Sequence, residues 1–176
     1  ETEKLMLRFL QSDATLAGKQ FICKSLGTIA TKKSVPVLKQ MMTDKNTDEM
    51  ALLVLEKIPD PAADKAMRNA LPYASSNIKV AIINSLGFRR DTKAVELLTK
   101  LIHENDPLVS ASAISALGAI GTQEASFILS TASDIFTGDQ KWMAMNAWLK
   151  CADRFIIENN HEEALMIYKE VYHANP

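Results

Sequence analysis

The chain has 176 residues, enough for a domain with a sizeable core. Its 20 Lys and Arg residues nearly balance 21 Asp and Glu residues, and the net charge of −1 excludes a global field that would draw the chain onto nucleic acid or an acidic membrane. With six glycines, six prolines and 6% aromatic residues, the composition argues against a β-rich domain. No apolar run approaches the roughly 18 residues of a membrane-spanning helix, and two distant cysteines, Cys23 and Cys151, exclude a disulfide-stapled scaffold.

A short leucine-centred motif recurs along the chain. Three copies are nearly identical: Ser25-Leu26-Gly27, Ser85-Leu86-Gly87 and Ala116-Leu117-Gly118. Leu55 fills the gap between the first two copies, and Leu149 is a weaker fifth member. The five leucines are then 29, 31, 31 and 32 residues apart, and internal repetition at such a period is typical of a solenoid.

The residues around each leucine predict two amphipathic helices per repeat. Apolar residues recur three and four positions before the leucine, and again 11, 12 and 15 positions after it. Neither helix can bury its apolar stripe alone, so neighbouring repeats must stack. We therefore predict an all-α fold, a right-handed α-α superhelix of about five helical hairpins. It forms a single domain over residues 1–176, with units at about 13–44, 45–74, 75–104 and 105–136 and a C-terminal cap at 137–176.

Capping residues agree with this division into helices. Asp106 followed by Pro107 predicts the start of a first helix, and Asp91 can cap a second helix. The glycines at 87, 118 and 121 fall where first helices are expected to end. The paired helices, the period near 31 and the Leu-Gly-x-Ile/Phe corner resemble the short HEAT-like repeats of bacteria, of the kind found in phycobiliprotein lyases. Residues 50–101 resemble a bacterial HEAT-repeat segment more narrowly.

The C-terminal segment differs from the repeats before it. Residues 161–172 are similar to the second half of a tetratricopeptide repeat, and we interpret them as part of a cap, because terminal repeats of solenoids are atypical. Trp142 and Trp148 are expected to fill the core of this cap; a stacking platform for a ligand is the alternative. The resemblance implies a solenoid that presents a binding surface, and it transfers no catalytic residues.

No arrangement typical of catalysis or metal binding stands out. His103, His161 and His173 form no metal-binding pair, and surface positions explain all three. Cys23 occupies a slot that is apolar in the other repeats, so a buried thiol explains it. We therefore predict no catalytic residues, no metal site and no cofactor, and a protein that is not an enzyme.

If the function is binding, the repeat register predicts where the partner lies. In HEAT-type solenoids the second helices line a concave groove, and offsets opposite their apolar stripes face into it. The predicted partner-binding residues are Lys39, Lys65, Arg68, Lys100 and Phe127. The four cations favour an acidic peptide, although lysines are also common on solvated helix faces. Phe127 is either a hydrophobic hot spot or a residue that packs against the cap.

These observations predict a non-catalytic protein-interaction or scaffolding module that binds a peptide or a neighbouring domain in the groove. One alternative is a rigid spacer arm of a larger multidomain bacterial protein. Another is a HEAT-repeat lyase or DNA-repair-type enzyme, for which Glu96 and Phe127 are the candidates. Arg89 and Arg90 form a basic edge, but the net charge and the few aromatic residues argue against nucleic acid, and no membrane contact is expected. The sequence leaves a periplasmic, secreted or cytoplasmic location open.

Overall fold

The computed structural model describes residues 1–174, which divide between two compact units, Glu1–Ile82 and Ile83–Pro176. We call them the N-terminal and the C-terminal unit and describe each by itself. All regular structure in residues 1–174 is helical, and the predicted all-α fold of repeated helical hairpins is confirmed. The single domain over residues 1–176 stays a prediction.

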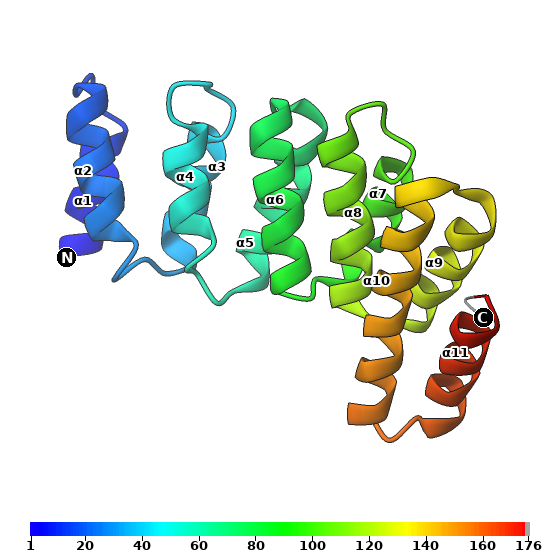
Figure 1. The fold of residues 1–176 in the computed structure, drawn as a ribbon. Coiled ribbons are helices and arrows are strands. Elements are labelled where there is room, and N and C mark those ends of the chain that lie inside the picture. The colour runs from blue at the N-terminus through cyan, green and yellow to red at the C-terminus, as the bar shows by residue number, and fades with distance from the viewer. Residues whose placement is uncertain (175–176) are drawn as a thin grey trace. The chain divides into compact units, whose positions relative to one another are not determined.

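The N-terminal unit stacks first and second helices in two layers. It contains α1 (Thr2–Leu10), α2 (Leu16–Leu26), α3 (Val35–Met41), α4 (Asp48–Leu55), α5 (Pro61–Ala70) and the beginning of α6 (Ser76–Phe88), with short 3-10 turns at Lys32–Ser34 and Leu71–Tyr73. The first helices α2 and α4 pack side by side, and the second helices α3 and α5 pack on each other behind them (Figure 1).

The C-terminal unit repeats this arrangement with longer helices. After the end of α6 come a 3-10 turn (Thr92–Ala94), α7 (Val95–Leu101), α8 (Pro107–Ile120), α9 (Gln123–Ile135), α10 (Gly138–Ile157) and α11 (His161–His173). The first helices α8 and α10 pack together, and α7 packs on α9 (Figure 1). The last helix, α11, packs on α10. No helix within residues 1–174 is both long and apolar enough to cross a membrane.

Side-chain caps fix where several of these helices begin. The Asp106 carboxylate accepts hydrogen bonds from the backbone N–H groups of Leu108 and Val109, at 3.0 and 3.4 Å, and confirms the predicted start of α8. Thr122 caps α9 in the same way, through the N–H of Ala125 at 3.1 Å. Each cap satisfies a donor that the first helical turn leaves unpaired.

The first helix, α1, was not predicted from the repeat pattern. It is held by its own Glu3, whose carboxylate accepts hydrogen bonds from the Ser34 hydroxyl at 2.7 Å and from the Thr31 N–H at 2.8 Å. Partial burial acts to raise the pKa of Glu3, but these hydrogen bonds outweigh it and lower the pKa below its usual value. A carboxylate thus joins α1 to the start of the 3-10 turn that precedes α3.

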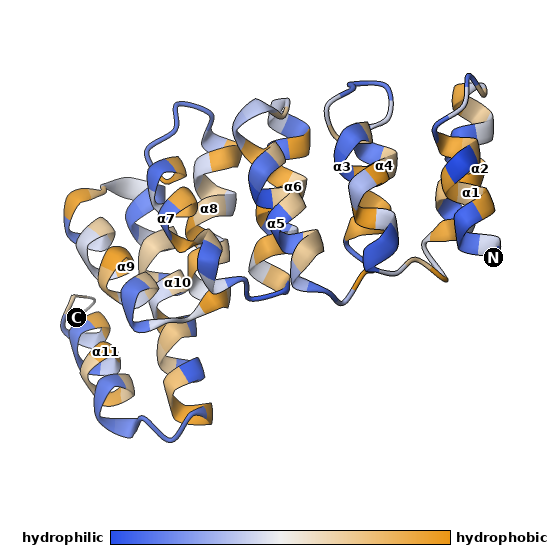
Figure 2. Ribbon diagram, turned by 180° about the vertical axis from the view of Figure 1, so that it is seen from behind, coloured by the Kyte–Doolittle hydropathy of each residue, from blue (hydrophilic) through white to orange (hydrophobic). Residues whose placement is uncertain are grey.

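The core follows the leucine repeat through four hairpins and then shifts by one residue. Leu26, Leu55, Leu86 and Leu117 are all fully buried. Most helices carry both hydrophobic and hydrophilic residues, as expected of amphipathic helices (Figure 2). The predicted fifth member is wrong: Leu149 is half-exposed, and Trp148 is only 5% exposed and takes its place. Trp148 restores a spacing of 31, and its indole N–H donates to the Ser126 hydroxyl at 2.9 Å.

Two of the three glycines predicted to end first helices lie inside them instead. Gly87 belongs to α6 and Gly118 to α8. A Cβ atom at Gly118 would lie 2.6 Å from the carbonyl oxygen of Ala147, so glycine is required here for the close approach of α8 to α10. Only Gly121 ends a helix as predicted, because its φ of 66° is left-handed and its N–H caps α8.

Trp142 is the second correction in the cap. It is 52% exposed, so it does not fill the core as expected. The residues of α10 that do so are small, aromatic or, in one case, a methionine: Ala144, Met145, Ala147, Trp148, Cys151, Ala152 and Phe155. Trp142 lies in the first turns of α10, on a side of the helix that the burial pattern leaves toward solvent.

Candidate functional site

The predicted binding residues of the N-terminal unit lie on its second helices. Lys39 is on α3, and Lys65 and Arg68 are on α5. Lys39 and Lys65 are exposed, and within residues 1–174 neither has an ion pair or a side-chain hydrogen bond. Arg68 is half-buried and already takes part in an interaction within the chain. The two lysines are therefore better placed than Arg68 to meet an external carboxylate.

The remaining two predicted residues lie on second helices of the C-terminal unit. On α7, the Lys100 ammonium contacts the Glu96 carboxylate at 2.9 Å, one helical turn away. The hydrogen bond from Lys100 and its charge lower the pKa of Glu96, which keeps the carboxylate ionised. This pair offsets the positive charge of Lys100. It also argues against Glu96 as a proton donor in an enzyme.

Phe127, on α9, borders a pocket that also involves the cap helix. The pocket has a volume of about 270 Å³ and is formed by α9, α10 and α11. Its floor includes the buried rings of Trp148 and Phe155, and Met166 lies on the α11 side. The Phe127 side chain is nevertheless 73% exposed. It lines the pocket beside the cap without being buried by it. Its role as a binding hot spot stays a prediction.

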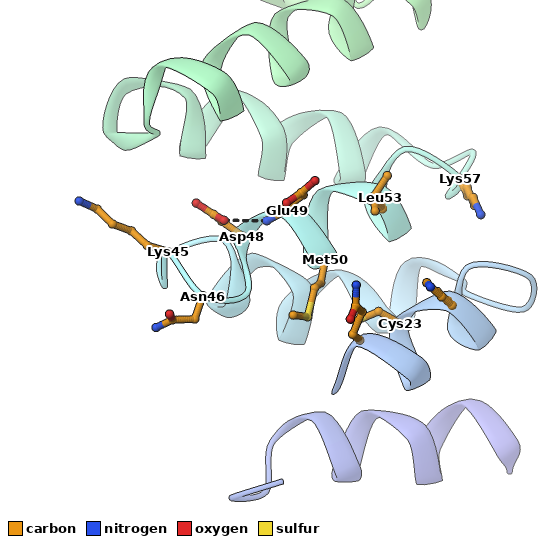
Figure 3. Close-up of a pocket in the computed structure, with 10 residues that line it drawn as sticks. Cys23, Lys45, Asn46, Asp48, Glu49, Met50, Leu53 and Lys57 are labelled. Carbon is orange, nitrogen blue, oxygen red and sulfur yellow. Dashed lines mark hydrogen bonds between the residues drawn. The ribbon is translucent and has the colours of Figure 1, made fainter. Parts of the chain in front are cut away.

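A second pocket, between α2 and α4, was not anticipated from the sequence. It has a volume of about 230 Å³ and is lined by residues of α2, of α4 and of the segments before and after α4 (Figure 3). Met50 and Leu53 supply apolar walls, and Lys45 and Lys57 lie at opposite ends. The lining residues are Gln20, Cys23, Lys24, Lys45, Asn46, Asp48, Glu49, Met50, Leu53 and Lys57. The shorter spacing of 29 residues before Leu55 was the one sequence signal that set these two helices apart.

The charges of this second pocket are mixed. Two carboxylates, Asp48 and Glu49, stand among its three lysines. Asp48 is nearly buried, and its carboxylate accepts the backbone N–H of Glu49 at 2.7 Å, within the first turn of α4 (Figure 3). An acidic residue at a helix start is stabilised by the helix dipole, so these carboxylates have a structural explanation. The pocket shows no pair of groups arranged for proton transfer.

The two cysteines are unreactive by environment. Burial raises the pKa of the Cys23 thiol to about 11 and that of the Cys151 thiol to about 12. Because the thiolate is the nucleophile, neither group is activated. The three histidines are exposed, as expected. Within residues 1–174, no three His, Cys, Asp or Glu side chains gather in a way that could hold a metal ion.

The stacked helical hairpins place this chain in the class of α-helical repeat proteins. Residues 68–134 match the family model of HEAT repeats. Among solved structures, the chain is similar to human deoxyhypusine hydroxylase in complex with glycerol, with a TM-score of 0.63 and 24% sequence identity. The likeness covers 77% of this chain and 49% of that enzyme, so the chain spans about half the enzyme's length. A search of curated proteins found no match.

The similarity corrects one prediction from the sequence. Because no catalytic motif was recognisable, we predicted that this chain is not an enzyme. That prediction does not stand, because a solved structure similar to this chain is an enzyme, human deoxyhypusine hydroxylase. The inference failed because a fold does not fix a function, which depends on the residues placed upon it. At 24% identity the likeness shows the fold alone and assigns no activity or site to this chain.

Proposed function

We propose that this chain is a protein-binding repeat module, and that its C-terminal unit holds an apolar side chain of the partner in the pocket beside Phe127. The observation that carries the proposal is the exposure of Phe127. A phenylalanine that is 73% exposed at the edge of a concave pocket leaves apolar surface in water that a partner would cover.

The floor of this pocket suits such a role. Trp148 and Phe155 are fixed by burial, and the Trp148 indole is held by its hydrogen bond to Ser126. A side chain that enters between Phe127 and Met166 therefore meets a rigid aromatic surface and displaces water from it. Binding hot spots are typically aromatic residues in such desolvated pockets.

The charged groups of each unit suggest which charges it would favour in a bound segment. Glu163 and Glu170 of α11 line the Phe127 pocket and favour a basic residue in the segment bound there. On the N-terminal unit, the unpaired Lys39 and Lys65 favour an acidic stretch. Each unit thus has its own charge preference for a bound peptide or neighbouring domain.

The proposal is tested by affinity capture from a lysate of the source organism with the Phe127→Ser variant. We expect one or more proteins to be retained by the unmodified chain and lost with Phe127→Ser, because truncation of a hot-spot aromatic costs about 2 kcal/mol or more in binding. Tyr73→Ser is the matched control, since Tyr73 is a similarly exposed aromatic residue that does not line the Phe127 pocket.

Both variants should unfold at the same temperature as the parent chain, because both side chains are exposed. A partner retained equally by all three chains would place binding elsewhere and contradict the role of Phe127. Empty captures with every chain would instead favour the rigid spacer arm.

A further inference from the structure

A notch in the C-terminal unit arises from the repeat itself. The buried repeat residues Leu86, Leu117 and Trp148 are the anchors of the first helices α6, α8 and α10. Two residues after each anchor, these helices carry Phe88, Ala119 and Lys150, each 31 residues from the next. The middle position is small while its neighbours are large. All three residues line one cavity of about 400 Å³, which also includes Arg90 and Ile157.

The apolar part of the notch is unusually exposed. Phe88 is 90% exposed, the largest exposed fraction among the large hydrophobic residues of the described chain, and Ile157 is 70% exposed. Both side chains contribute to the same cavity. Their solvent exposure is a cost to the isolated chain that a bound apolar side chain would remove.

The charged part of the notch has an excess of cations. Arg90, Lys150 and Arg154 line it together with a single carboxylate, that of Asp153. Arg154 contacts Glu158 at 2.6 Å, and the Asp153 carboxylate accepts the hydroxyl of Tyr168 at 2.8 Å. Within residues 1–174, Arg90 and Lys150 have no ion pair and no side-chain hydrogen bond. Two cations beside an apolar surface are thus available to a ligand.

The backbone at Arg90 adds an independent observation. Arg90 has a φ of 53°, in the left-handed region that disfavours residues with a Cβ atom. The equivalent position in the next repeat, 31 residues later, is Gly121, with a φ of 66°. A Cβ atom at Gly121 would also lie 3.0 Å from the Arg154 side chain, so both conformation and packing favour glycine there. Arg90 has a Cβ atom in the same left-handed conformation and is therefore less stable there than glycine would be.

We propose that this notch is a second binding site, which takes a peptide segment with an acidic residue next to an aromatic or aliphatic residue. The apolar side chain enters above Ala119 between Phe88 and Ile157, and the carboxylate meets Arg90 and Lys150. The planar guanidinium of Arg90 can grip the carboxylate with two hydrogen bonds. The site is separate from the Phe127 pocket and does not depend on it.

The geometry favours a peptide over an anionic membrane surface. The notch is concave and of side-chain size, about 400 Å³, and it offers two unpaired cations. Electrostatic attachment to a membrane generally uses a cluster of about four or more basic residues on a convex or flat face. The whole chain carries a net charge of −1, which does not supplement the local attraction.

The experiment selects ligands for the full chain from a displayed library of random dodecapeptides. Selection is repeated on the Phe127→Ser variant, so that peptides of the other pocket are discarded. We expect the remaining peptides to combine Asp or Glu with Phe, Leu or Ile. The binding of synthetic copies is then measured by fluorescence anisotropy against the parent chain and its variants.

The decisive variant is Arg90→Gly. We expect it to weaken peptide binding about tenfold, because it removes a hydrogen bond between two charged groups. The same change should raise the midpoint of thermal unfolding by about 2–4 °C, because it relieves the left-handed strain. A residue with a merely structural role would not give both effects. Ala119→Arg, which fills the notch, should also abolish binding, and Lys93→Glu, an exposed charge outside it, should not.

Three outcomes would overturn the proposal. One is that no acidic and apolar peptides are enriched. Another is that the enriched peptides bind Arg90→Gly and Ala119→Arg as well as the parent chain. The third is that the chain binds phosphatidylglycerol vesicles, with the same sensitivity to these variants, and no peptide, which would make the notch a membrane contact.

Discussion

The glycine that follows the repeated leucine meets a lysine side chain in the N-terminal unit, whereas in the C-terminal unit it meets the backbone of the neighbouring first helix. A Cβ atom added to Gly27 would meet the Lys57 side chain at 3.1 Å. A Cβ atom added to Gly118 would meet the backbone of Ala147 at 2.6 and 2.9 Å. The two glycines follow equivalent leucines of the repeat, Leu26 and Leu117, yet they have different neighbours.

The difference also appears in the space between the helices. The looser pair, α2 and α4, leaves the pocket of about 230 Å³ shown in Figure 3. In the tighter pair, Gly118 is buried, and the notch lies beside it, lined by both Gly118 and Ala119. Nearly identical motifs therefore define which residues are equivalent in the two units. How closely two neighbouring first helices approach depends on the residues of the next repeat.

The largest expected effect concerns the tight pair. Gly118→Val should destabilise the C-terminal unit by about 3 kcal/mol or more, because the backbone of Ala147 cannot move aside without separating α8 from α10. Gly27→Val should cost no more than about 1 kcal/mol, because Gly27 is in a right-handed conformation and the end of the Lys57 side chain is flexible.

Urea unfolding followed by circular dichroism measures both values. Ala119→Val is the matched control beside Gly118, since Ala119 is only half-buried and already carries a Cβ atom. Equal losses at Gly118 and Gly27 would contradict the distinction between the two units.

A smaller loss of stability is expected when Trp148 is replaced by leucine, the residue at the equivalent position of the other repeats. Trp148→Leu should destabilise the chain by about 2 kcal/mol, because it removes buried aromatic volume and leaves the Ser126 hydroxyl without its partner. The double variant with Ser126→Ala should lose less than the sum of the two single changes. Additive losses would show that the hydrogen bond contributes nothing beyond packing.

The smallest effect distinguishes the cysteines of the two units. Burial raises the pKa of both thiols, to about 11 for Cys23 and about 12 for Cys151. Cys23 should therefore react faster with iodoacetamide at pH 9, as measured by mass spectrometry on the single variants Cys23→Ala and Cys151→Ala. Faster labelling of Cys151 would contradict the tighter burial assigned to the C-terminal unit.

The same shifts set the sign of the pH dependence of stability. Both thiols stay protonated in the folded chain at pH values where the unfolded chain has lost those protons. Their contribution to the free energy of unfolding is complete below about pH 9 and falls as the pH rises toward 11. Urea unfolding should show this decline, and it should be smaller in each alanine variant.

The predicted binding residues were only partly informative. The repeat register correctly placed Lys39 and Lys65 on exposed second-helix faces. It could not show that Glu96 already pairs with Lys100 or that Arg68 is engaged within the chain. A helical period defines the direction of a side chain, whereas its partners depend on rotamers and on residues brought near by folding.

The sequence by itself determined the helical repeat, its period of about 31 and the buried leucines, because amphipathic periodicity is a local property of the chain. It also determined the capped start of α8 at Asp106. Of the three glycines predicted to end helices, only Gly121 does so. Only the tertiary structure decided that Gly118 serves a backbone contact, that Trp148 rather than Leu149 fills the last anchor position, and that Phe88, Ala119 and Lys150 form a notch. These features depend on how closely neighbouring helices pack, and that distance is set by residues about 31 positions apart acting together.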